Sequence, residues 1–112
     1  MRGDCVAALP AYRRALAAAV ELGDRAETAV EIQGVAMALA GCGESALALR
    51  LAGATEAEFE ALAIDLSGIV FWSELLARFL GHARSELGPQ ATTTAWDEGR
   101  RTPITQALAL AR

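Results

Sequence analysis

The sequence predicts an all-α fold, and three observations lead to this prediction. Hydrophobic residues make up 54% of the 112 residues but aromatic residues only 5%, and the excess of alanine and leucine favours closely packed helices over a β-sandwich. Apolar residues recur at intervals of three and four along most of the chain. Helix start and stop signals separate these periodic segments. We therefore expect one domain of five to six helices arranged as antiparallel hairpins.

The first two expected helices are separated by a clear boundary. One face of the first, residues 9–22, carries apolar side chains at helical spacing: Leu9, Tyr12, Leu16, Ala19 and Val20. Pro10 lacks an amide hydrogen, so we expect the regular helix to begin near it or to kink there. Gly23 ends this helix. Asp24 is placed to cap the second helix, with Glu27 in position for a capping box, and that helix should extend to about residue 40.

The third expected helix spans residues 44–63. The break at residues 41–43, Gly-Cys-Gly, is tight enough to fold this helix back antiparallel against the second. Its second half is acidic at Glu56, Glu58 and Glu60, where the apolar face narrows. We expect that end of the helix to be solvated.

The fourth expected helix follows a loop at residues 65–68 and carries the largest apolar side chains. These side chains form two adjoining rows at helical spacing: Phe71, Leu75 and Phe79, and Trp72, Leu76, Leu80, Ala83 and Leu87. We expect this helix to be the main contributor to the core, with Trp72, Leu76, Phe79 and Leu80 mostly buried.

Two shorter helices are expected near the end of the chain. Gly88 and Pro89 end the fourth helix, and a fifth at residues 90–98 should be closed by Gly99 in a left-handed conformation. Thr102 as N-cap and Pro103 at the first helical position should begin the last helix.

Charge, cysteine content and hydropathy limit the possible functions. The net charge is −4, the pI is near 4.9 and the ten basic residues are scattered, so no basic face for phosphates or an anionic membrane is expected. Cys5 and Cys42 do not make a disulfide framework, and no signal peptide is visible, which fits a reducing cytoplasm. The apolar stretch at residues 69–80 is shorter than the roughly 20 residues that cross a bilayer. We expect a cytoplasmic protein without direct nucleic-acid or membrane binding.

No set of residues in the sequence matches a catalytic, cofactor or metal site. His82 is the single histidine, too little for a histidine-based metal site or a catalytic triad. Cys42 would be reactive only beside a base or cation, so a packed or idle thiol is the preferred interpretation. The carboxylates of the third helix and Asp65 lack the spacing of a calcium loop. We therefore predict a non-enzyme with no catalytic residue, no cofactor and no metal.

Several segments resemble tetratricopeptide repeats. Small residues and a tyrosine stand at the spacing of the second helix of such a repeat: Gly3, Asp4, Ala8, Tyr12, Ala15 and Leu16. Residues 22–25 resemble a junction between repeats, and residues 34–54 resemble the next unit. Residues 95–100, Ala-Trp-Asp-Glu-Gly-Arg, followed by a capped helix, resemble the carboxy-terminal end of repeat regions in bacterial LuxR-type transcription regulators and related signal-transduction ATPases.

This resemblance implies one helical-repeat module, with repeat-like helices at residues 1–63 and a helical cap at residues 64–112. The spacing from Gly3 to Gly43 is 40 residues (43 − 3), longer than the roughly 34 of the strict unit, so the repeats are degenerate.

Two functions from different classes follow from these observations. The leading hypothesis is a non-catalytic interaction module that holds another protein or another domain of a transcriptional or signalling regulator. The alternative is a domain that senses a small effector between helices near Trp72 and Phe79. An exposed apolar strip would favour the first. An enclosed pocket with unpartnered inward groups, such as Ser73 or Glu74, would favour the second.

The beginning of the chain suggests how the module assembles. It opens on what resembles the second helix of a repeat, so we expect the apolar face of Leu9, Leu16 and Val20 to lack its usual neighbour. Either the chain is part of a longer protein, or a second copy covers this face in a two-fold homodimer through the N-terminal helix.

Overall fold

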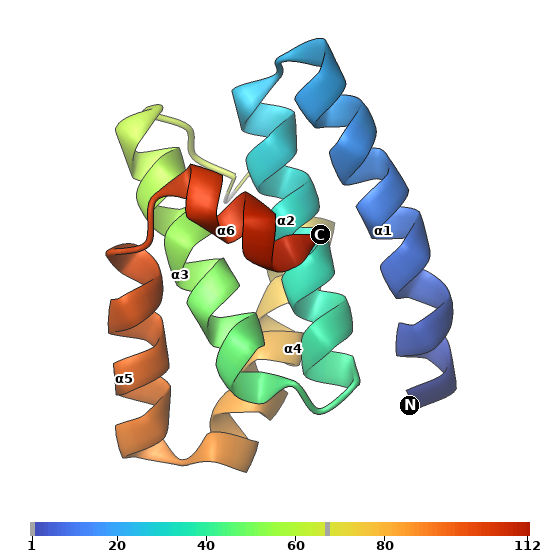
Figure 1. The fold of residues 1–112 in the computed structure, drawn as a ribbon. Coiled ribbons are helices and arrows are strands. Elements are labelled where there is room, and N and C mark those ends of the chain that lie inside the picture. The colour runs from blue at the N-terminus through green and yellow to red at the C-terminus, as the bar shows by residue number, and fades with distance from the viewer. Residues whose placement is uncertain (1, 67) are drawn as a thin grey trace.

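The described part of the chain consists of six helices and contains no strand (Figure 1), which confirms the all-α prediction. The computed structural model describes residues 2–66 and 68–112, with side chains from Ala7 onward. The helices are α1 (Arg2–Leu22), α2 (Arg25–Gly41), α3 (Ser45–Ala61), α4 (Val70–Leu87), α5 (Pro89–Arg100) and α6 (Ile104–Ala111).

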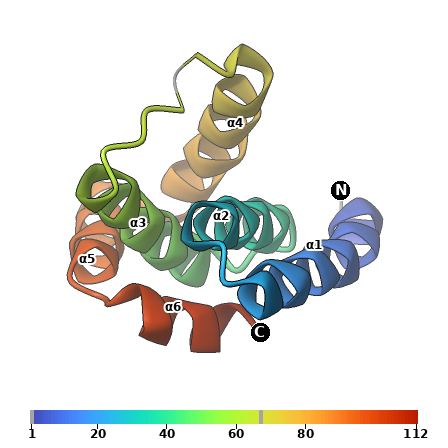
Figure 2. The ribbon, with the colours of Figure 1, turned by 90° about the horizontal axis from the view of Figure 1, so that it is seen from above.

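Four of the helices lie side by side in one curved layer, in the spatial order α1, α2, α3 and α5. Figure 2 shows this layer from above, with α4 on one face and α6 across the opposite face. The most extensive helix contacts join α3 to α5, α1 to α2 and α2 to α3, and α4 and α6 each contact both α2 and α3. The two central helices are therefore covered on several sides.

The core is built mainly from α2 and α3. Residues 32–40 of α2 and residues 51–55 of α3 are buried without interruption. A helix buried on all sides needs no polar face, so its apolar residues need not form a stripe. Small side chains such as Ala36, Ala40, Ala48 and Ala52 let the helices approach closely.

The prediction that the fourth helix would be the main core contributor is wrong. In α4 only Leu80 and Ala83 are buried, whereas Trp72, Leu76 and Phe79 are half-buried. The reason is the position of α4, which lies outside the layer and contacts it along one side (Figure 2).

Glycines allow close helix crossings at two places. The ring of Tyr12 in α1 packs directly on Gly34 in α2, where a Cβ atom would meet the ring carbons. At the crossing of α3 and α5, a Cβ atom on Gly53 would lie 2.7 Å from the carbonyl oxygen of Trp96. A Cβ atom on Gly99 would lie 2.8 Å from the carbonyl carbon and 2.9 Å from the Cα of Arg50. Because Gly99 lies inside α5 and is buried, the prediction that it ends the helix is wrong.

The helix ends match the predicted signals in part. The Asp24 side chain accepts a hydrogen bond from the backbone nitrogen of Glu27 at 3.0 Å, which confirms the predicted N-cap. Pro10 lies inside α1, which is already helical from Arg2, so the helix does not begin near that proline. The N-cap of α6 is Pro103, so the prediction of Thr102 as N-cap is wrong. The Thr102 hydroxyl donates to the carbonyl oxygen of Glu98 at 2.7 Å.

The apolar face of α1 is covered, contrary to the expectation from the sequence. Leu16 is almost completely buried, and Leu9 and Val20 pack against the same core. The Nε of Arg13 donates to the carbonyl oxygen of Ala111 at 3.2 Å, which ties α1 to the end of α6. The homodimer stays a prediction. The face of α1 from which it was inferred packs against the core of the same chain.

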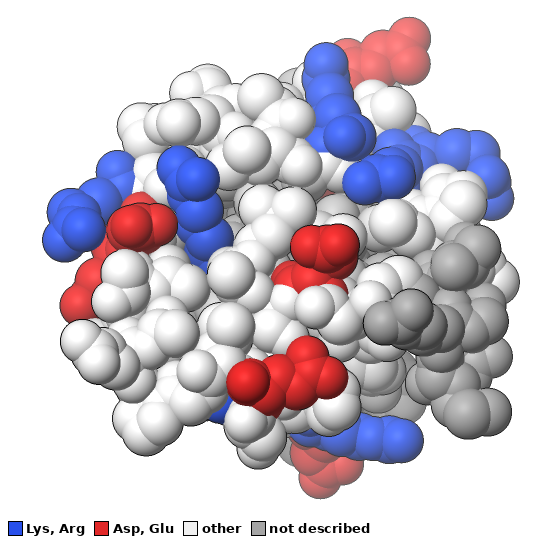
Figure 3. Space-filling view, turned by 60° about the horizontal axis from the view of Figure 1, so that its bottom comes forward, with Lys and Arg blue, Asp and Glu red and all other residues white. Residues whose placement is uncertain are grey.

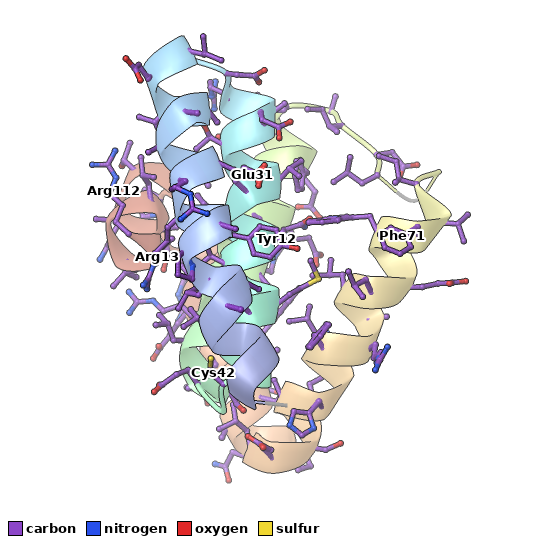
Figure 4. The ribbon with its side chains drawn as sticks, turned by 90° about the vertical axis from the view of Figure 1, so that its right-hand side faces the viewer. Tyr12, Arg13, Glu31, Cys42, Phe71 and Arg112 are labelled. Carbon is purple, nitrogen blue, oxygen red and sulfur yellow. The ribbon has the colours of Figure 1, made fainter. Side chains whose placement is uncertain are left out.

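The interpretation of Cys42 as a free thiol is also wrong, because Cys42 is disulfide-bonded. It caps the end of α2, and Figure 4 places it beside the first turns of α1. The side chain of the other cysteine, Cys5, lies outside the described residues. Disulfides form and persist mainly in oxidising compartments. The cysteines therefore do not support the prediction of a reducing cytoplasm.

Candidate functional site

The beginning of α4 exposes three consecutive large apolar side chains, which we call the α4 patch. Ile69, Val70 and Phe71 are 53%, 61% and 73% exposed, and the other large hydrophobic side chain with high exposure in the described chain is Leu22, at the end of α1. Figure 2 shows why: this end of α4 diverges from the helical layer. Figure 4 labels Phe71 on the first turn of α4.

A cavity of about 270 Å³ lies behind this part of α4, between it and α2, α3 and α5. Its apolar lining is formed by Ala52, Phe59, Ile64, Leu66, Trp72, Leu76, Leu80 and Trp96, and its polar lining by Gln33, Glu56, Glu60, Asp65 and Ser73. Both tryptophans of the chain therefore line one cavity. The effector site expected near Trp72 and Phe79 stays a prediction. Trp72 lines this cavity, but Phe79 does not, and Trp96 of α5 does.

A partly buried polar contact connects α2 to α4 at this cavity. The indole Nε1 of Trp72 donates to the Oε1 of Gln33 at 2.8 Å, and Gln33 is only 6% exposed. Sequence reasoning missed Gln33 because a single glutamine in an apolar helix gives no signal until every face of that helix is known to be covered. Ser73 donates to the carbonyl oxygen of Leu66 at 3.3 Å, and Glu74 is exposed. Neither is the unpartnered inward group named from the sequence.

The carboxylates at the end of α3 are held by two arginines. Arg100 of α5 contacts Glu56 at 3.0 Å and Glu60 at 2.6 Å, and its hydrogen bond lowers the pKa of the Glu60 carboxyl below its usual value. Arg25 of α2 donates to both oxygens of Glu58, at 3.1 and 3.2 Å. Because Glu58 is only 8% exposed, the prediction of a fully solvated acidic end is wrong at this position.

A different carboxyl has a raised pKa. Burial raises the pKa of Glu31 to about 7, and a hydrogen bond and charge repulsion from Glu27 add to the effect. Figure 4 shows Glu31 on α2. The partial desolvation of this group makes its ionisation unfavourable near neutral pH.

His82 lies apart from the cavity, in a surface group with Glu86 and Ser45. Its Nε2 is 3.1 Å from one oxygen of Glu86, and the buried Ser45 hydroxyl donates to the other oxygen at 2.7 Å. In a nucleophilic triad the imidazole contacts the hydroxyl, and the carboxylate orients the imidazole. Here the carboxylate stands between them, so the imidazole cannot take the hydroxyl proton in this arrangement.

Charged side chains do not gather into a basic surface on the face seen in Figure 3. On the part of this face that the structure describes, acidic side chains are separated by uncharged surface, and arginines lie around the margin. Among the described side chains, those of residues 7–66 and 68–112, no three histidine, cysteine or acidic groups come together as metal ligands would. No helix within these residues is long and apolar enough to span a bilayer.

Comparisons with protein families, curated proteins and solved structures found no match for this chain. The α4 patch and the adjoining cavity must therefore be interpreted from their own geometry.

Proposed function

We propose that the chain is a non-catalytic helical interaction module that binds another polypeptide at the α4 patch. The observation that carries this proposal is the run of three large apolar side chains, Ile69, Val70 and Phe71, each more than half exposed. Covering such side chains contributes roughly 1.5 to 3 kcal/mol each, before the losses of association. The three side chains would therefore form the apolar centre of a larger interface, in which a few residues carry most of the binding energy.

The architecture supports this role. The layer of α1, α2, α3 and α5 holds one side of α4 through Leu80 and Ala83 and leaves its first turn projecting (Figure 2). The resemblance to the repeat regions of LuxR-type regulators makes another domain of such a regulator the partner that we propose first. In that setting the module would hold a neighbouring domain and perform no chemistry of its own.

Affinity capture from cells that make the protein tests the proposal. The bait is the wild-type chain, compared with the double variant Val70→Ser/Phe71→Ser and with Leu22→Ser as a matched control. Leu22 is 83% exposed at the end of α1. Because Val70, Phe71 and Leu22 are exposed, the variants should keep the wild-type free energy of unfolding within about 0.5 kcal/mol.

The expected result is a polypeptide retained by the wild type and by Leu22→Ser, and depleted about tenfold or more by the double variant. Recovery of the same polypeptides in equal amounts by all three baits would contradict a role for the α4 patch.

One observation favours the second candidate function, the sensing of a small effector. Trp72 and Trp96 belong to different helices yet line the same cavity. This cavity lies beside the α4 patch, so a ligand in it would contact the same helix that we propose to bind the partner.

A further inference from the structure

We propose that the cavity between α2, α3, α4 and α5 binds a small neutral aromatic molecule that carries a carbonyl oxygen, of the aromatic carboxamide class. This inference rests on the second candidate function and deepens it by naming the chemical class of the effector. It concerns the cavity and not the α4 patch. Three features of the cavity lead to this ligand: aromatic walls, a buried donor group, and charged side chains that already have partners.

The walls of the cavity suit a flat ring. Half of the six aromatic residues of the chain line it, namely Phe59, Trp72 and Trp96, and aliphatic side chains complete the apolar lining. Apolar and aromatic side chains with a few polar groups are typical of ligand pockets. The volume of about 270 Å³ lies near the lower limit of roughly 300 Å³ for such pockets, so the ligand has one or two rings. The Arg84 guanidinium already lies 5.7 Å from the centroid of the Trp96 ring, so this ring needs no ligand cation.

Gln33 supplies the buried donor. An indole N–H can only donate, so the Oε1 of Gln33 faces Trp72 and the NH2 group points the other way. No acceptor among the described residues takes a hydrogen bond from this NH2 group, and no fully buried side-chain polar atom of those residues lacks a partner. The NH2 group therefore keeps some accessible surface, which faces the cavity that Gln33 lines. A ligand carbonyl oxygen there would satisfy a donor on a side chain that is 94% buried (100 − 6).

The charged side chains of the lining disfavour a charged ligand. Arg100 holds Glu56 and Glu60, and Asp65 has an interaction of its own. A ligand cation would have to compete with Arg100 for the two glutamates, and a ligand anion would be repelled by them. Because burying an unpaired charge costs far more than burying a hydrogen-bonded neutral group, the cavity favours a neutral ligand.

The probe is benzamide, and three analogues separate the contributions. Benzoate and benzamidine keep its shape but are an anion and a cation at neutral pH, and toluene is neutral but lacks the carbonyl oxygen. The affinity of benzamide should be at least about tenfold above that of each analogue.

Nitrogen-15 NMR reports the site directly. The chain has three glutamines, Gln33, Gln90 and Gln106, and no asparagine, so few side-chain NH2 signals are present. Benzamide should shift the NH2 signals of Gln33 and the indole N–H signals of Trp72 and Trp96 until saturation. The signals of Gln90 and Gln106 should stay in place, because these side chains are exposed and do not line the cavity.

Variants assign the binding to the cavity. Gln33→Met removes the donor with little change in side-chain length, so it should weaken benzamide about tenfold and leave toluene unchanged. Leu76→Trp fills the cavity that Leu76 lines and should abolish the binding of both molecules, which keeps the test decisive if Gln33→Met fails to fold. Leu75→Trp is the matched control, because Leu75 is also half-buried on α4 but does not line this cavity. This control should bind benzamide as the wild type does.

The proposal is overturned if benzamide gives no saturable shift of the Gln33 signals up to about 50 mM, or if any of the three analogues binds as tightly. It is also overturned if Gln33→Met or Leu76→Trp leaves the benzamide affinity unchanged. The double variant Val70→Ser/Phe71→Ser should retain benzamide binding. A failure of the cavity and a failure of the α4 patch are therefore distinguishable.

Discussion

Gly99→Ala tests whether the crossing of α3 and α5 is as close as the structure shows. Gly99 lies inside α5, and its added Cβ atom would meet backbone atoms of Arg50 in α3 at less than 3 Å. Backbone atoms cannot rotate away as a side chain can, so α5 must shift as a whole. Because α3 and α5 form the most extensive helix contact in the fold, this shift should disturb much of their interface.

The magnitude follows from two opposing effects. Replacing glycine by alanine inside a helix stabilises it by about 1 kcal/mol. Overpacking a close contact costs about 1 to 3 kcal/mol, and a clash with backbone belongs at the upper end. The net expectation for Gly99→Ala is a loss of about 1 to 2 kcal/mol in the free energy of unfolding.

Gly81→Ala is the matched control, because Gly81 also lies inside a helix but nothing lies within 4 Å of an added Cβ atom. This variant should gain about 0.5 to 1 kcal/mol from helix propensity alone. Urea unfolding followed by circular dichroism measures both changes. Equal stabilisation by the two substitutions would refute the close crossing of α3 and α5.

Three further predictions concern stability, each measured by urea unfolding. The pKa of Glu31 is raised to about 7 in the folded chain. The free energy of unfolding of the wild type should therefore fall by about 1 kcal/mol as the pH rises from about 5 to 7.5, after allowance for the partial exposure of this group. Glu31→Gln should remove this dependence. Arg25→Ala should lower the free energy of unfolding by about 2 kcal/mol, because it leaves the buried carboxylate of Glu58 unpaired. Arg100→Ala should lower it much less, because the carboxylates that Arg100 contacts are exposed. Equal losses for the two variants would contradict this reasoning. Ala63→Gly should raise the free energy of unfolding by about 0.5 to 1 kcal/mol, because Ala63 has a left-handed φ of +56° that glycine adopts without strain. A lower free energy of unfolding in this variant would show that the strain is absent.

The pH dependence has a definite sign. The folded-state pKa of Glu31 lies above the ordinary value of 4.5, so the folded chain binds more protons between these two pH values. The stabilising contribution is complete below about 4.5 and is lost as the pH rises through about 7. Comparison with Glu31→Gln cancels the titration of groups that both proteins share.

Local signals were sufficient to predict the helical class and several helix boundaries. The Asp24 cap is confirmed because capping needs only residues within one turn of each other. Gly43, with φ of +88°, closes the predicted turn before α3 for an equally local reason. These features depend on short-range geometry that the sequence specifies directly.

Features that depend on the relative placement of helices were not predictable in the same way. The large apolar residues of α4 indicated a core helix, but burial is decided by how many neighbours a helix has, and α2 has more. Gly99 has the sequence position of a helix terminator, yet its role is set by a crossing with α3. Gln33 belongs to the cavity only because Trp72 comes within hydrogen-bond distance of it.

Site-specific photo-crosslinking at the α4 patch tests the proposed function most directly. A benzophenone side chain replaces Phe71 in one protein and Leu22 in another, since both positions are exposed, and both proteins are irradiated in cells that make the natural chain. The proposal predicts one discrete covalent adduct with a polypeptide at position 71 and none at position 22. No adduct at position 71, or the same adducts at both positions, would contradict the claim that the α4 patch binds a partner.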